Sequence, residues 1–213
     1  MKKLSIALAA ALATGFGASA ASATVINFAA EGVNGGERGV ADGTIVNTAA
    51  LGGLNLQFAG GVGGASSDFA YFNGAANGRL PGLGTCTALN KTGTCSPGND
   101  DNITVNEFVN VAFLDGPFNV RQLSFNGQNA SLDGSLGLVK ITTDVGAAVA
   151  GLVMTFAAAN VFDFGFVNWI QFDFVDTEFV VAQISDIPVP GALPLLLSGL
   201  AGLGFAASRR KKA

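Results

Sequence analysis

The sequence predicts an all-β protein: a single antiparallel β-sandwich, jelly-roll-like, over residues 24–186. Short segments of this middle part alternate apolar with polar residues, which is the period of a half-buried strand. Asn, Gly and Asp separate these segments, as in turns between antiparallel strands. No long segment shows the apolar stripe and capping residues of an amphipathic helix. Short strands joined by such turns are typical of sandwiches and jelly rolls.

The expected strands follow one another along this middle segment. Residues 54–58 alternate strictly, and residues 103–113 form a second strand that starts at Ile103 and Val105. The phase of this second strand slips, which predicts either a bulge near Glu107 or an inward-facing Glu107. Further strands are expected over 118–120, 123–125, 136–141, 149–156 and 162–174.

A turn is expected at Asp115-Gly116-Pro117, because Gly allows positive φ and Pro fixes its own φ. The only weak helical pattern covers residues 147–159, where Val, Gly and Thr oppose a helix.

Cys86 and Cys95 are the two cysteines of the chain. In an exported protein their close spacing predicts one disulfide that closes a Gly/Thr/Asn-rich loop. The alternative is a two-Cys metal site. Such a site would need His or further Cys as ligands, and the chain has neither.

The N-terminal end predicts a secretory signal peptide over residues 1–23. Two lysines follow Met1, residues 4–13 are an apolar run, and Ala21-Ser22-Ala23 is a cleavage signal of the A-x-A type. Cleavage there would make Thr24 the first residue. An anchor that is not cleaved and a cut after Ala20 are the alternatives.

The C-terminal end, residues 187–213, is expected to hold one short transmembrane helix. Residues 192–207 carry no charge, and a helix of this length spans roughly 24 Å at 1.5 Å per residue. That is short of a hydrocarbon core of about 30 Å. A basic stop follows and would stay cytoplasmic; its residues are Arg209, Arg210, Lys211 and Lys212.

The motif Val189-Pro190-Gly191-Ala192, the Leu- and Gly-rich run and the final basic cluster together resemble the PEP-CTERM sorting signal. They are similar to the variant with Val-Pro-x-Pro in place of Pro-Glu-Pro, so the Glu of the common motif is missing. The resemblance implies a Gram-negative bacterium that makes exopolysaccharide, and processing of the tail by the membrane protease exosortase. The secretion machinery would export the chain, which would pass through the inner membrane to the cell envelope or extracellular matrix. An ordinary tail anchor is the alternative.

The middle segment resembles a β-sandwich ectodomain that recurs in this group of proteins. Gly-Leu-Gly-x-Cys at residues 82–86, a second Cys, an Asp-Asp-Asn turn and an apolar strand over residues 106–113 carry this resemblance. It implies a fold and no activity.

The charge of the chain excludes one class of partner. Without the two ends, the middle segment keeps five basic residues against fifteen acidic ones, a net charge of −10. Such a surface repels nucleic acid, since phosphate binding needs clustered Lys and Arg.

Carboxylates are the remaining candidates for chemistry, since a chain without His has no Ser-His-Asp device. Asp100, Asp101 and Glu107, with Asn99 and Asn102, form the densest oxygen cluster and are candidate ligands for Ca²⁺. An Asx-rich turn, in which these side chains bond the local backbone, explains the same residues. No other cofactor is expected.

A glycosidase would need two facing carboxylates. Asp163, Asp173 and Asp176 lie near Trp169, but Asp163 and Asp173 share the polar side of the expected strand, where solvent-facing acids are ordinary. We therefore expect no enzymatic activity. The expected role is that of a structural or adhesive surface or matrix protein associated with exopolysaccharide. The alternatives are a Ca²⁺-dependent carbohydrate-binding module and a secreted hydrolase that works by carboxylates alone.

Overall fold

The computed structural model describes residues 23–75, 80–98, 100–127 and 137–186. One compact unit spans Thr24–Ile187, and the fold below is that of this unit. Residues 1–22 of the expected signal peptide lie outside the described residues. So do Asn99 and the whole expected sorting segment 187–213, with its motif, transmembrane helix and basic stop.

The all-β prediction is confirmed, because strands dominate the unit and every pairing between described strands is antiparallel. The strands are β1 (Thr24–Asn27), β2 (Arg38–Val40), β3 (Ile45–Val46), β4 (Leu56–Val62), β5 (Ala65–Asn73), β6 (Gly82–Cys86), β7 (Glu107–Phe113), β8 (Phe118–Val120), β9 (Gln122–Gly127), β10 (Leu138–Thr143), β11 (Leu152–Thr155), β12 (Gly165–Val167), β13 (Trp169–Phe174) and β14 (Phe179–Asp186).

Helices are short in the described part of the chain. The two α-helices are α1 (Phe28–Gly35) and α2 (Phe156–Val161), and a 3-10 turn, η2, covers Gly146–Ala148. Both α-helices begin at a capping side chain: Asn27 accepts from Ala30 N, and Thr155 accepts from Ala158 N. A helix long and apolar enough to cross a membrane is absent from the residues that the structure describes.

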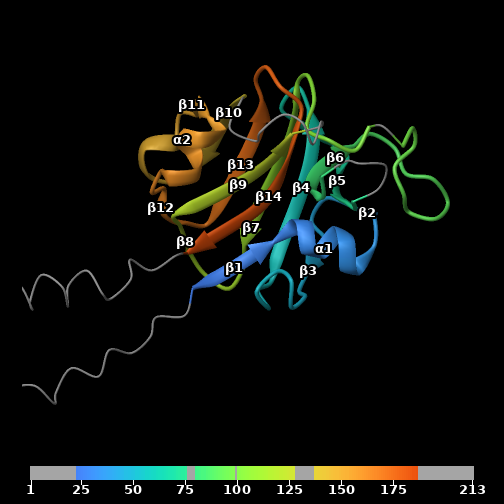
Figure 1. Ribbon diagram of the computed structural model, residues 1–213, viewed down its shortest axis with the longest axis horizontal. Helices are drawn as coiled ribbons and strands as arrows, with labels where there is room; N and C mark the ends of the chain where they lie inside the picture. The colour runs from blue at the N-terminus through green and yellow to red at the C-terminus, as the bar shows by residue number, and fades with distance from the viewer. Residues whose placement is uncertain (1–22, 76–79, 99, 128–136, 187–213) are drawn as a thin grey trace, which may run out of the picture. The chain divides into compact units, whose positions relative to one another are not determined.

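Twelve strands form one curled sheet with the main order β1-β14-β6-β5-β4-β7-β13-β10-β11, and β8 and β12 form a separate ribbon. The long strand β5 bridges two parts of this sheet. Its first half pairs with β4 at Asp68, and its second half pairs with β6 from Phe69 to Asn73. Figure 1 shows β9 and β14 running beside each other, and their register confirms that β9 pairs along most of β14.

Phenylalanine rings fill the core between the two parts of the sheet. Phe125 on β9 stacks on Phe156 of α2 at a centroid distance of 4.9 Å. It also meets Phe172 on β13 edge to face at 5.9 Å and Phe179 on β14 at 5.6 Å. Each such buried ring contributes about 1.5 to 3 kcal/mol by burial, and each aromatic pair contributes about 0.5 to 1.5 kcal/mol more.

The expected strand over residues 103–113 starts later than predicted, at Glu107. Val105 is exposed, and Asn106 has a φ of 66°, which turns the chain into β7. Ile103 makes only an isolated bridge with Phe179. The register between β7 and β4 is unbroken from Glu107 onward, so of the two alternatives the inward-facing Glu is correct.

The expected strand over residues 162–174 is two strands in two sheets, β12 and β13. Asn168 separates them, because its amides bond the carboxylate of Asp144 on another loop. Phe166 is 64% exposed, so aromatic residues at alternate positions of this segment do not all face the core. The expected strand over residues 149–156 is similarly reduced to β11. The end of the weak helical pattern over residues 147–159 does form a helix, α2, although its composition opposes one.

The two ends of the folded unit lie side by side. Strand β1 pairs with the end of β14 in a register that sets Thr24 opposite Asp186. Figure 1 shows β1 leading directly into α1, and β14 ending next to the start of β1. The first and last residues of the described sheet pairing, Thr24 and Asp186, are therefore direct neighbours.

Candidate functional site

The predicted disulfide between Cys86 and Cys95 is present, with Cα atoms 5.8 Å apart. Cys86 ends β6, and Leu89 pairs with Cys95 across the loop that the bond closes. The two cysteines and Leu89 pack on Tyr71, whose hydroxyl accepts a hydrogen bond from the Cys95 backbone N–H at 3.3 Å. Burial raises the pKa of Tyr71, and the hydrogen bond from Cys95 opposes this rise.

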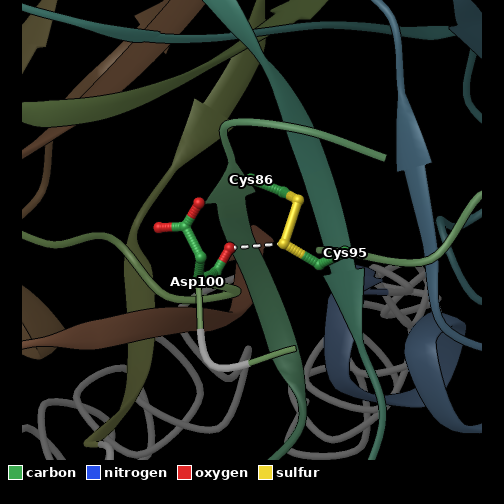
Figure 2. Close-up of side chains that lie close together, drawn as sticks. All are labelled: Cys86, Cys95 and Asp100. Carbon is green, nitrogen blue, oxygen red and sulfur yellow. Dashed lines mark hydrogen bonds between the residues drawn. A yellow bond between two sulfur atoms is a disulfide. The ribbon is translucent and has the colours of Figure 1, made fainter. Parts of the chain in front are cut away.

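Asp100 lies next to this disulfide. One ligand atom each of Cys86, Cys95 and Asp100 lies within 4.8 Å of the others, the only such group of three among the described Cys, Asp and Glu residues. Figure 2 shows that the Asp100 backbone oxygen faces Cys95 Sγ, at 2.6 Å, while the carboxylate points away. Sulfurs joined in a disulfide are not thiolates, so the oxidised group offers a metal a single carboxylate.

Glu107 is a buried acceptor at the start of β7. Its residue is 5% exposed, and its Oε2 atom accepts hydrogen bonds from Thr85 Oγ1 at 2.9 Å, Thr104 N at 2.6 Å and Thr104 Oγ1 at 2.8 Å. These bonds join β6 and the turn at residues 103–106 to the start of β7. Glu107 therefore fixes the acidic segment, residues 100–107, against β6.

Desolvation raises the pKa of Glu107, and the hydrogen bonds from Thr104 and Thr85 oppose that rise. The hydroxyl of Thr85 lies within hydrogen-bond distance of two acceptors, Glu107 Oε2 and the Asn102 carbonyl, but it has only one proton. It therefore donates to one of these acceptors at a time, and desolvation is the main cause of the raised pKa of Glu107.

The other two predicted ligands lie against β6. Asp101 and Asn102 are buried, and a Cβ added at Gly84 would come within 2.3 Å of the Asp101 carbonyl oxygen. Gly84 thus allows the backbone of the acidic segment to approach the strand. Asp100 is half-buried, and its Oδ2 accepts from Thr87 N at 3.1 Å.

The carboxylates of Asp100, Asp101 and Glu107 do not form a group of three that meets the 4.8 Å spacing. Asp100 accepts from Thr87 N, thirteen residues earlier, and Glu107 accepts from Thr104 N, three residues earlier, so the Asx-turn interpretation also stays a prediction. Calcium binding by these residues stays a prediction, which calorimetric titration with Ca²⁺ tests.

The carboxylates considered for glycosidase chemistry each have a local partner. Asp163 lies 3.5 Å from Arg121, and Asp176 accepts from Leu138 N at 2.8 Å. Asp173 accepts from Gln171, and desolvation raises its pKa. The expected absence of enzymatic activity stays a prediction.

Sequence reasoning missed a polar pocket of about 120 Å³ between β9, β14 and α2. The residues that line it are Gln122, Leu123, Ser124, Asn160 and Gln183. The alternation along β9 indicates that Gln122 and Ser124 share a polar face, but the sequence gives no signal that the distant Asn160 and Gln183 complete it.

Comparison of the chain with models of protein families, with curated proteins and with solved structures found no match.

Proposed function

We propose that this chain is an exported protein of the PEP-CTERM type. An exosortase processes its tail, and the folded unit, a jelly-roll-like ectodomain, acts as a structural or adhesive component of the envelope or extracellular matrix, in association with exopolysaccharide. The observation that supports this proposal best is the pairing of Thr24 with Asp186.

This pairing matters because proteolysis at either end must leave the fold intact. The expected signal-peptide cut precedes Thr24, and the expected sorting motif begins after Asp186, at Val189. Both β1 and β14 therefore keep all their residues after processing. Because the last strand ends three residues before Val189, the motif is not needed for the described sheet pairings.

The contacts of the acidic residues support a structural role over catalysis. Glu107 accepts a hydrogen bond from Thr85 on β6, Asp163 forms an ion pair with Arg121, and the disulfide removes both thiols from chemistry. A hydrolase would instead need a carboxylate pair directed at a common substrate.

Intact mass spectrometry tests the proposal. The full chain is expressed in an exosortase-carrying Gram-negative host and recovered from the envelope and the medium. We expect a mass that lacks residues 1–23 and everything after about residues 189–192, and that is about 2 Da lower because the disulfide removes one hydrogen per sulfur.

Two controls sharpen this experiment. Expression in the same host without its exosortase should leave the tail uncut, and so should a variant with Val189→Ala and Pro190→Ala. A wild-type mass that retains residues 209–213 in the exosortase-carrying host would contradict sorting. It would indicate a protein that stays anchored by its tail.

A further inference from the structure

The polar pocket is formed where an edge strand, a central strand and a short helix meet. Gln122, Leu123 and Ser124 come from β9, Gln183 comes from β14, and Asn160 comes from α2. Figure 1 shows α2 above one end of β9, with β14 on the other side of that strand. Three segments far apart in the sequence thus supply one lining.

A β-bulge directs Gln183 into this pocket. Phe179 and Val181 belong to the core, so strict alternation along β14 would also turn Gln183 inward. The register with β9 shifts between Val181 and Gln183, and the core position passes to Ile184. Gln183 therefore lies on the outer face, directly opposite Ser124. Bulges that re-aim a side chain in this way are common at functional sites.

The open edge of β9 completes the lining. Among the described strands β9 pairs only with β14, so its other edge keeps backbone groups available for hydrogen bonds. The side chain of Leu123 is buried in the core, so this residue meets the pocket through its backbone. The stacking of Phe156 on Phe125 fixes α2 beside β9 and brings the exposed Asn160 to the pocket.

The four polar side chains in the lining are neutral, and each of them both donates and accepts hydrogen bonds. Sugar hydroxyl groups also donate and accept. An anionic ligand would call for Arg or Lys, and a hard metal ion would call for carboxylates, but neither type of residue lines the pocket. The net charge of −10 in the middle segment also repels anionic polymers.

The size of the pocket fits a small ligand group. Its 120 Å³ correspond to roughly four water molecules at about 30 Å³ each, enough to admit one edge of a sugar ring. None of the lining residues is aromatic, so binding would rest on hydrogen bonds and be weak for one unit. Repeated weak contacts along a polymer still give useful retention by avidity.

We propose that the pocket formed by Gln122, Ser124, Asn160 and Gln183 binds single units of a neutral polysaccharide. This inference rests on the proposed matrix role, and it names the chemical class of the matrix partner: an uncharged, polyhydroxylated chain.

Affinity electrophoresis of the exported protein tests the inference. Native gels contain dextran, hydroxyethylcellulose or galactomannan as neutral probes, and dextran sulfate as the anionic probe. We expect retardation by at least one neutral probe and none by dextran sulfate. Gln183→Ala should weaken that binding about two- to tenfold, which corresponds to the loss of one or two neutral hydrogen bonds.

A second variant tests the pocket without a substitution in a strand. Asn160 is exposed on α2, so Asn160→Trp should block the pocket without changing a strand, and it should abolish the retardation. The matched control is Gln57→Ala on β4, whose side chain bonds the Gly43 carbonyl outside the pocket. This control should bind as the wild type does.

Three results would overturn the pocket proposal: wild-type retardation that both pocket variants keep, equal loss in Gln57→Ala, and no retardation by any neutral probe. The mass measurement decides the matrix role separately. A correctly processed protein without neutral polysaccharide binding would refute the pocket alone. An unprocessed protein that binds would refute sorting and leave the pocket in place.

Discussion

Substitution of Glu107 by Gln removes one buried carboxyl group and keeps its shape. The pKa of Glu107 is raised by desolvation, so the folded protein holds this proton more tightly than the unfolded chain does. The stability that this group contributes is therefore fully present below its unfolded pKa of 4.5, and it is lost as pH rises through the folded pKa. The Gln variant has no proton to lose at this position and should lack this dependence.

The magnitude follows from linkage. One group that is protonated in the folded state and ionised in the unfolded state changes the free energy of unfolding by about 1.4 kcal/mol per pH unit. The difference between wild type and Glu107→Gln should change with pH above 4.5, with this slope as its upper limit, and flatten once the folded carboxyl group is ionised. Taking the difference between the unfolding free energies of the two proteins cancels the contributions of other groups whose pKa is raised, such as Asp173.

The assay is urea denaturation followed by tryptophan fluorescence, at intervals from pH 4 to pH 8. Glu37→Gln, at a half-buried residue outside the strands, controls for the loss of one negative charge. A difference between wild type and Glu107→Gln that stays constant over the whole range would refute the reasoning. It would mean that Glu107 ionises as readily in the fold as in the unfolded chain.

Three further predictions concern the packing and the disulfide. Phe125→Ala should lower the free energy of unfolding in urea by about 3 to 5 kcal/mol, because the Phe125 ring contacts three others. The control Phe166→Ala, at an exposed residue, should change it by about 0.5 kcal/mol or less, and equal losses would contradict the core assignment. Gly84→Ala should lower the free energy of unfolding by about 1 to 3 kcal/mol in the same assay, since its Cβ would collide with the Asp101 backbone. An unchanged free energy would show that the acidic segment does not pack on β6. Replacing Cys86 and Cys95 by Ser should lower the free energy of unfolding by about 2 to 3 kcal/mol, as expected for a loop this short. Added reductant should lower the stability of the wild type and leave that of the double variant unchanged.

Local patterns predict the features that a short stretch of the chain determines. The alternation at residues 54–58 recurs in the first three residues of β4, the turn at Asp115-Gly116-Pro117 separates β7 from β8, and Arg121 separates β8 from β9. The disulfide was predictable for the same reason: two cysteines close in the chain, with no other partner available.

Features decided by distant residues could not be predicted. The sequence leaves two alternatives at Glu107, and the inward one holds because Thr85, twenty-two residues earlier, joins Thr104 in bonding its carboxylate. A run of aromatic residues with one parity looks like a single strand until Asp144 bonds Asn168 and breaks it. The pocket depends on a bulge in β14 between Val181 and Gln183. This bulge is recognised only from the register of β14 with β9, which the sequence alone does not provide.

The place of β14 in the sheet has a mechanical consequence. This strand is held on both edges, by β1 and β6 on one side and by β9 on the other, and it is the last strand that the structure describes. Tension applied through the C-terminal end and opposed by the rest of the sheet would load both rows of hydrogen bonds in shear. Tension between the two ends of the chain would instead peel β1 from β14 one pair at a time, starting at Thr24 and Asp186. A surface protein held by its C-terminal end would thus resist drag better than one stretched between its termini, a difference that single-molecule pulling in the two geometries would measure.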